Sequence, residues 1–124
     1  MYRGVLIDES VTNPKNILEL AEVVSFRETT LESENFRGKV LFHNIKVKDQ
    51  NLWPILNLVM NTILEPGWYF HLVDEEILYV VMPGAILSAG NNENQLLNIF
   101  EYAVHHGIHP DQLNLKKLFA NPFA

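Results

Sequence analysis

Two histidines and two tyrosines are the residues of this sequence best suited to proton chemistry. His43 lies in an alternating stretch and His71 in a stretch rich in aromatic and β-branched residues, and both stretches predict strands; Tyr69 and Tyr79 lie in the same part of the chain as His71. An imidazole donates or accepts a proton near neutral pH, and a nearby phenol can complete a hydrogen-bonded pocket. If neighbouring strands bring these rings together, the sequence predicts a pocket between a sheet and a helix.

A structural role is the simpler interpretation of the same four residues. Histidines and tyrosines inside proteins usually satisfy their polar atoms with hydrogen bonds, without any catalytic task. The sequence also has no nucleophile elbow, no phosphate-binding loop and no dinucleotide fingerprint. We therefore expect no catalytic residue and no cofactor, and keep His43, His71, Tyr69 and Tyr79 as candidate pocket residues.

A second group of histidines, near the C-terminus, resembles a metal site only in its spacing. His105 and His109 are four residues apart, as zinc-binding pairs on helices are. Gly107 and Pro110 predict that the helix ends between them, so the two rings are not expected on one helical face. The acidic run 74–76 is expected to be a solvated turn, because three adjacent acids cannot all face one ion. No metal is expected.

Composition limits the class of protein. The 124 residues match one domain, 1–124, and hydrophobic residues make up 48% while charged residues make up 19%, against a typical charged share of about 25%. That balance favours an apolar surface covered by a second copy. A net charge of −6 argues against nucleic-acid binding. The lack of cysteine and of a long apolar run predicts a cytoplasmic protein that does not cross a membrane.

The predicted structure is organised around a hairpin of two strands, 68–73 and 77–82, joined by the acidic turn. Both arms are rich in aromatic and β-branched residues, which suit a half-buried pleated surface. A hairpin this short is marginal in water, so the other segments must extend and cover it.

The remaining elements follow from periodicity and capping residues. Alternation predicts strands over 2–7, 23–28 and 39–48, with a loop over 29–38 and an edge segment over 85–89. Helical periodicity predicts helices over 14–21, 52–63 and 93–106, with Asn13, Asn51 and Asn92 as their N-caps. In strand 39–48 the row that contains Leu41 and His43 is expected to face the covering helices.

These elements predict an α+β domain with an antiparallel sheet of about five strands covered by two or three helices, in the order β-α-β-β-α-β-β-α. The first six elements match a ferredoxin-like pattern, to which a strand and a helix are added. The tail 113–124 is rich in leucine and phenylalanine, and we expect it to dock on its own domain or on a neighbour.

Several short segments resemble a family of small uncharacterised prokaryotic proteins. They are the opening Tyr-Arg-Gly-Val-Leu-Ile-Asp-Glu-Ser (2–10), the strand 41–45, the Gly-Trp-Tyr at 67–69, the stretch 79–84 and the segment 101–108. The resemblance implies a prokaryotic cytosolic origin and a histidine at position 43, and it implies no assigned activity.

Two hypotheses on function follow. The preferred one is a non-catalytic binding or protein-interaction module that forms a homodimer through an apolar sheet face or its C-terminal tail. The alternative is a small enzyme or ligand carrier that uses His43 and His71, with Tyr69 or Tyr79, to hold a small molecule between sheet and helix.

Overall fold

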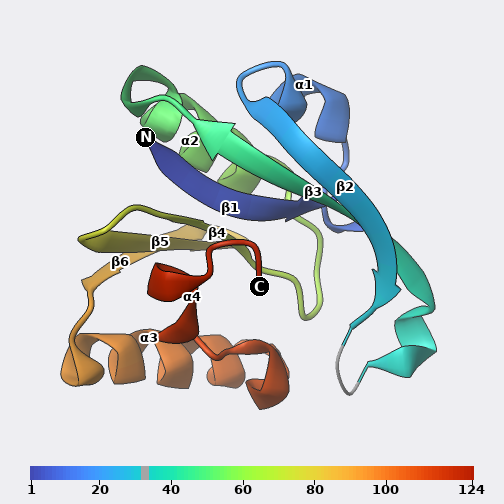
Figure 1. The fold of residues 1–124 in the computed structure, drawn as a ribbon. Coiled ribbons are helices and arrows are strands. Elements are labelled where there is room, and N and C mark those ends of the chain that lie inside the picture. The colour runs from blue at the N-terminus through green and yellow to red at the C-terminus, as the bar shows by residue number, and fades with distance from the viewer. Residues whose placement is uncertain (32–33) are drawn as a thin grey trace.

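One antiparallel sheet forms the centre of the protein. The computed structural model describes residues 1–31 and 34–124, and its six strands lie in the order β2-β3-β1-β4-β5-β6 (Figure 1). Every neighbouring pair in this sheet is antiparallel. The strands are β1 (Tyr2–Ile7), β2 (Glu22–Thr30), β3 (Lys39–Val47), β4 (Phe70–Val73), β5 (Ile77–Met82) and β6 (Ala85–Gly90).

Four α-helices within the described residues cover this sheet. They are α1 (Pro14–Leu18), α2 (Leu52–Thr62), α3 (Glu93–His105) and α4 (Lys117–Ala120). The two long ones, α2 and α3, each bury a stripe of apolar residues at helical spacing. No helix in this part of the chain is both long and apolar enough to pass through a membrane.

The predicted α+β class and antiparallel sheet are confirmed, whereas the strand count is one too low. Residues 85–90 form a full strand that pairs with β5 over its whole length. The chain turns back at Pro83-Gly84, where Gly84 has φ +74°, a conformation that glycine adopts without strain. The first arm of the central hairpin begins at Phe70 instead of Trp68, and the first helix ends at Leu18.

Helices cover both faces of the sheet, so the domain has three layers (Figure 1). Leu72 and Val73 are consecutive in β4 and therefore point to opposite faces. Leu72 packs in a core cluster with Ile55 and Leu56 of α2, whereas Val73 packs in a second cluster with Ile99 of α3. The sheet thus has one hydrophobic core on the side of α1 and α2 and another on the side of α3 and α4.

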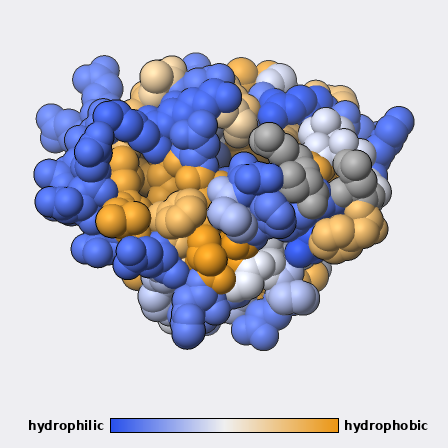
Figure 2. All heavy atoms as spheres, turned by 90° about the horizontal axis from the view of Figure 1, so that it is seen from below, coloured by the Kyte–Doolittle hydropathy of each residue, from blue (hydrophilic) through white to orange (hydrophobic). Residues whose placement is uncertain are grey.

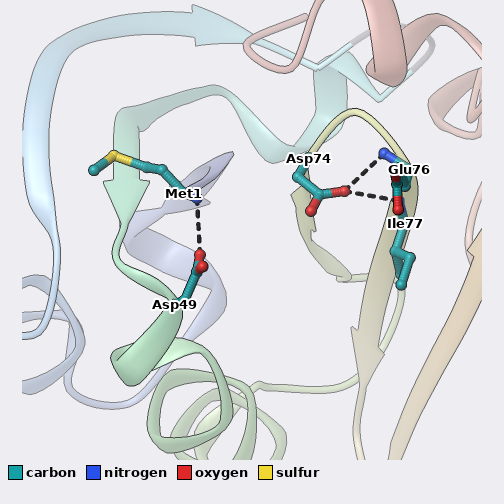
Figure 3. Close-up of polar contacts among 5 residues, drawn as sticks. All are labelled: Met1, Asp49, Asp74, Glu76 and Ile77. Atoms are coloured by element: carbon teal, nitrogen blue, oxygen red, sulfur yellow. Dashed lines mark hydrogen bonds and ion pairs between the residues drawn. The ribbon is translucent and has the colours of Figure 1, made fainter.

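Short polar contacts fix the turns next to the first and fourth strands (Figure 3). In the β4–β5 turn, the Asp74 carboxylate accepts hydrogen bonds from the backbone N–H groups of Glu76 and Ile77, both at 2.8 Å. The N-terminal ammonium of Met1 lies 2.8 Å from the carboxylate of Asp49, just before α2. The acidic turn thus has a structural task at Asp74, which folds the hairpin back on itself.

Candidate functional site

The central strand β1 decides where the two candidate histidines lie. His43 of β3 is opposite Leu6, and His71 of β4 is opposite Val5. Residues directly opposite each other across a strand pair share a face, and consecutive residues of one strand do not. His43 and His71 are therefore on opposite faces of the sheet, and the pocket expected to contain both imidazoles does not form.

His43 and Tyr79 belong to the face covered by α1 and α2. The His43 Nε2 atom lies 3.0 Å from the carboxylate of Asp8. Tyr79 contacts Tyr2 and Trp53 in edge-to-face geometry, with ring centroids 5.9 and 5.6 Å apart. These contacts give both side chains a structural role away from His71.

His71 and Tyr69 do lie together, in a cavity of about 510 Å³ on the other face. The cavity is between the sheet and the segment 110–118, and its walls are partly apolar and partly polar. They are formed by Val5, Ile7, Leu31, Phe42, Trp68, Leu113 and Leu118, with Asn114 and Lys117 among the polar lining residues. Its volume is within the roughly 300–1,000 Å³ range of small-molecule sites.

The His71 ring is almost fully enclosed, and its hydrogen bond defines its tautomer. The residue is 4% exposed, and its Nε2 atom lies 2.7 Å from the carbonyl oxygen of Pro122. A carbonyl oxygen only accepts, so Nε2 carries the hydrogen and donates it. Burial lowers the pKa of His71 from 6.5 to about 4, although the bond to Pro122 acts in the opposite direction. The ring is therefore neutral at physiological pH, and Nδ1 is an acceptor.

Tyr69 is engaged by the protein's own backbone. Its hydroxyl donates a hydrogen bond to the carbonyl oxygen of Gln112. Burial raises the pKa of Tyr69 above its ordinary value of 10.0, so the phenol stays protonated. This hydroxyl joins the strand region to the segment 110–112 and is not poised to exchange protons.

Arg37 supports the Trp68 wall of the cavity. Its guanidinium lies 4.2 Å from the centre of the Trp68 ring and donates to the carbonyl of Pro66 at 2.9 Å. The same side chain forms an ion pair of 2.7 Å with the buried carboxylate of Glu34. Sequence reasoning missed these residues because 29–38 was expected to be a polar loop. A glutamate and an arginine three apart were the only available signal.

The C-terminal segment closes the cavity from the side opposite the sheet. Leu113, Leu115 and Leu118 are buried in the α3 core cluster, and Pro122 supplies the carbonyl that holds His71. The apolar tail 113–124 thus packs on its own domain. Its leucines follow from the sequence, whereas the carbonyl of Pro122 could not be assigned a partner from sequence alone.

A different surface stands out at the edge of the sheet. The strand β2 has nine residues, all exposed except the partly buried Thr29, and in the described sheet it pairs with β3 alone. Phe26 is 72% exposed and Val24 is 48% exposed. Neither face of this strand is covered, although its sequence is that of a strand with an apolar side.

The outer surface of α3 carries a further group of apolar residues. Figure 2, which views the molecule from this side, shows hydrophobic side chains gathered in a patch within a hydrophilic surround. On α3, Leu96, Leu97 and Phe100 line a shallow groove together with Leu113 and Leu115. Leu97 is 50% exposed.

Within the described residues, the C-terminal histidines do not form a group that could bind a metal ion. The helix α3 ends at His105, as Gly107 predicted, and His106 stacks on Tyr102 with ring centroids 4.1 Å apart. His109 accepts a hydrogen bond from the backbone N–H of Asp111. In the described part of the chain, no three His, Cys, Asp or Glu side chains are grouped so that they could hold a metal ion.

Comparison of the chain with protein-family models, with curated proteins and with solved structures found no match. No residue role is therefore taken from a relative, and the site is interpreted from its own geometry.

Proposed function

We propose that this protein is a non-catalytic interaction module that forms a homodimer by pairing the β2 strands of two copies. The observation that carries the proposal is an exposed edge strand of nine residues that presents Val24 and Phe26 to solvent. An unpaired strand edge is a template for another strand, and exposed apolar side chains on it favour that pairing.

The composition of β2 supports strand pairing. Proteins protect free edges with charged side chains, especially lysine, with proline and with β-bulges. Glu22–Thr30 contains no lysine or proline, although it has three charged residues and a register shift between Val23 and Ser25. Its one basic residue, Arg27, is drawn onto its own domain. The guanidinium lies 4.8 Å from the Phe42 ring centre and donates to the carbonyl of Phe123 at 3.3 Å.

A second copy of this chain is the partner that best suits the edge. Two β2 strands in antiparallel register are related by a two-fold axis, so each copy uses the same surface and the assembly closes at two. The C-terminal tail, the other surface considered from sequence, buries its leucines in its own domain. Within the described residues, the β2 edge combines exposed apolar side chains with a strand edge that no other strand covers.

We propose no catalytic role because the candidate side chains are already bonded to other groups of the same chain. The hydroxyl of Tyr69 and Nε2 of His71 both donate to backbone carbonyls of the same chain, and His43 is paired with Asp8. A general acid or base needs a free proton path to a substrate atom. These three contacts occupy the Tyr69 hydroxyl and one nitrogen of each histidine, so none of these atoms is open to a substrate.

The proposal is tested by measuring molar mass over a wide concentration range, by light scattering or sedimentation. We expect the wild type to be a dimer and Phe26→Lys to be a monomer, because lysine on an edge strand opposes pairing. Leu97→Lys is the control, since it places the same charge on another exposed apolar position, on α3, where Leu97 is 50% exposed. A monomeric wild type, or dissociation by Leu97→Lys and not by Phe26→Lys, would contradict the proposal.

The distance between spin labels on the two copies gives an independent readout of the same interface. The chain contains no cysteine, so a Val24→Cys variant has one thiol on β2. We expect a nitroxide attached there to show a short distance to its copy in the dimer, and a label at Leu97→Cys to show a longer one. Equal distances would exclude a β2 interface.

We infer further that the first four strands with α1 and α2 are a ferredoxin-like variant. In the sheet, β3 lies between β1 and β2, and α1 connects these two outer strands along the chain. Likewise β1 lies between β3 and β4, and α2 connects β3 to β4. This is a doubled split β-α-β arrangement. The resemblance of short segments to prokaryotic proteins and the lack of cysteine support a prokaryotic, cytoplasmic origin.

A further inference from the structure

The Nδ1 atom of His71 belongs to the cavity lining and has no hydrogen-bond partner among the described residues. Nε2 of His71 is used by Pro122, and no described residue forms a hydrogen bond with Nδ1. In the described part of the chain, every polar side-chain atom that is fully enclosed has a partner. Nδ1 therefore reaches accessible space, and the space next to this ring is the cavity of about 510 Å³.

The geometry points to a ligand with a hydrogen to donate. We propose that this cavity binds a neutral, mostly apolar molecule, such as a fused aromatic ring, that carries one hydroxyl or N–H group and donates it to Nδ1 of His71. No described residue that lines the cavity belongs to β2, and this inference does not depend on the dimer.

The chemical class follows from the walls and from the tautomer. Because Nε2 must donate to a carbonyl, the neutral ring offers only a lone pair at Nδ1, and a carboxylate or phosphate would meet that lone pair unfavourably. Leu31, Phe42, Trp68 and Leu118 surround the space with apolar surface. His71 is 4% exposed, so a charged group placed against its ring would lose hydration, and a neutral donor is favoured at this end of the cavity.

The aromatic part of the ligand has a defined wall to pack on. Trp68 is 8% exposed, and the guanidinium of Arg37 holds its ring at 4.2 Å. Large aromatic surfaces that are held in place stabilise bound rings through offset or edge-to-face packing. The exposed residues Asp111, Asn114 and Lys117 and the partly buried Gln112 also line the cavity and give it a polar side next to the apolar one.

Indole and benzofuran test the proposal, because the two molecules have nearly the same shape and only indole has an N–H donor. Binding to the wild type is measured by calorimetry or by ligand-observed NMR. We expect indole to bind about tenfold more tightly, since one hydrogen bond to an otherwise unpaired acceptor is at stake. The nitrogen resonance of Nδ1 should move upfield with indole and stay in place with benzofuran.

The variant His71→Gln separates the acceptor from the rest of the site. A glutamine amide can still donate to the Pro122 carbonyl, while the acceptor that faces the cavity is lost. We expect this variant to bind indole and benzofuran equally. His43→Gln makes the same substitution on the opposite face of the sheet and should keep the preference, and so should Phe26→Lys.

Three results would overturn the proposal. They are equal affinity of the wild type for the two molecules, no binding of either up to its solubility limit, and an unchanged indole preference in His71→Gln. If His71→Gln does not fold, the comparison of indole with benzofuran on the wild type, together with the Nδ1 resonance, decides the matter alone.

Discussion

At His71, burial keeps the imidazole neutral, although the hydrogen bond to the Pro122 carbonyl acts in the opposite direction. The folded protein binds a proton on this ring only near pH 4, whereas the unfolded chain binds one near pH 6.5. As the pH falls from about 6.5 to about 4, the unfolded state is protonated and the folded state is not. The free energy of unfolding therefore falls in this window, by an amount on the order of 3 kcal/mol. Above about pH 6.5 this contribution is fully present.

The pH dependence of His71 is measured by urea unfolding at several pH values, with the wild type and His71→Gln compared. Glutamine does not titrate, so the difference in stability between the two proteins should shrink as the pH falls from about 7 to about 4. Titrating carboxylates affect both proteins alike and cancel in the comparison. Parallel curves for the two proteins would show that His71 is not held neutral in the fold.

The placement of the candidate residues shows what a local sequence pattern can predict and what it cannot. Sequence patterns correctly predicted that His43 and His71 lie on strands, by alternation around His43 and by aromatic and β-branched residues around His71. They could not relate the faces of two strands that are not adjacent in sequence. That relation depends on the register of each with β1, where a shift of one residue reverses every side chain.

At the scale of elements, asparagine before a helix turned out to be a good marker of position and a poor marker of hydrogen bonding. Helices do begin after Asn13, Asn51 and Asn92, as predicted. Only Asn92 accepts hydrogen bonds from the first turn, whereas the amide of Asn51 donates to the carbonyl of Leu20. Sequence predicts where a helix begins, and tertiary contacts decide what its cap residue does.

Replacement of Asn92 by alanine tests this difference. The Asn92 side chain accepts from the backbone N–H groups of Asn94 and Gln95, at 2.9 and 3.3 Å. Its loss should lower the free energy of unfolding by about 1 kcal/mol. Asn13→Ala is the matched control and should change stability by less, because Asn13 makes no side-chain cap bond. Denaturant unfolding of the three proteins gives both values, and equal losses would argue against the cap at α3.

The same scale explains the strand that was undercounted. Residues 85–90 contain Ala, Ser and Gly, which are weak strand formers, so local propensity predicted no more than an edge segment. They form β6 because the Pro83-Gly84 turn delivers them directly beside β5. Segment 29–38, expected to be a loop, also contains more regular structure than predicted, since β2 continues to Thr30 and residues 35–37 form a short 3₁₀ turn, while residues 32–33 lie outside the described residues.

At the scale of the whole molecule, the parts that sequence could not predict are those that depend on distant segments. The hydrogen bond from His71 to Pro122 joins residues 51 positions apart, and the cavity exists only because segment 110–118 crosses the sheet there. Apolar residues in the tail predicted that it would dock. Their number and spacing carried no information on which face of the sheet would receive them.

The two cores share one sheet, and this predicts a single unfolding transition. Phe70 and Leu72 of β4 belong to the α2 cluster, while Val73 of the same strand belongs to the α3 cluster. Loss of either core would leave one whole face of a four-residue strand exposed to water, which the remaining core cannot compensate. Leu56→Ala and Ile99→Ala, one on each side, should each reduce the free energy of unfolding by about 2–5 kcal/mol.

Circular dichroism and tryptophan fluorescence report on this transition in different ways, since Trp68 is buried and Trp53 is half exposed. In both variants the two signals should keep a common midpoint, because damage to one core is transmitted through β4 and β5 to the other. Leu97→Ala, at an exposed position of α3, should shift the midpoint little. If Ile99→Ala separated the two signals while Leu56→Ala did not, the side of α3 would unfold on its own, and the sheet would not be the element that couples the two cores.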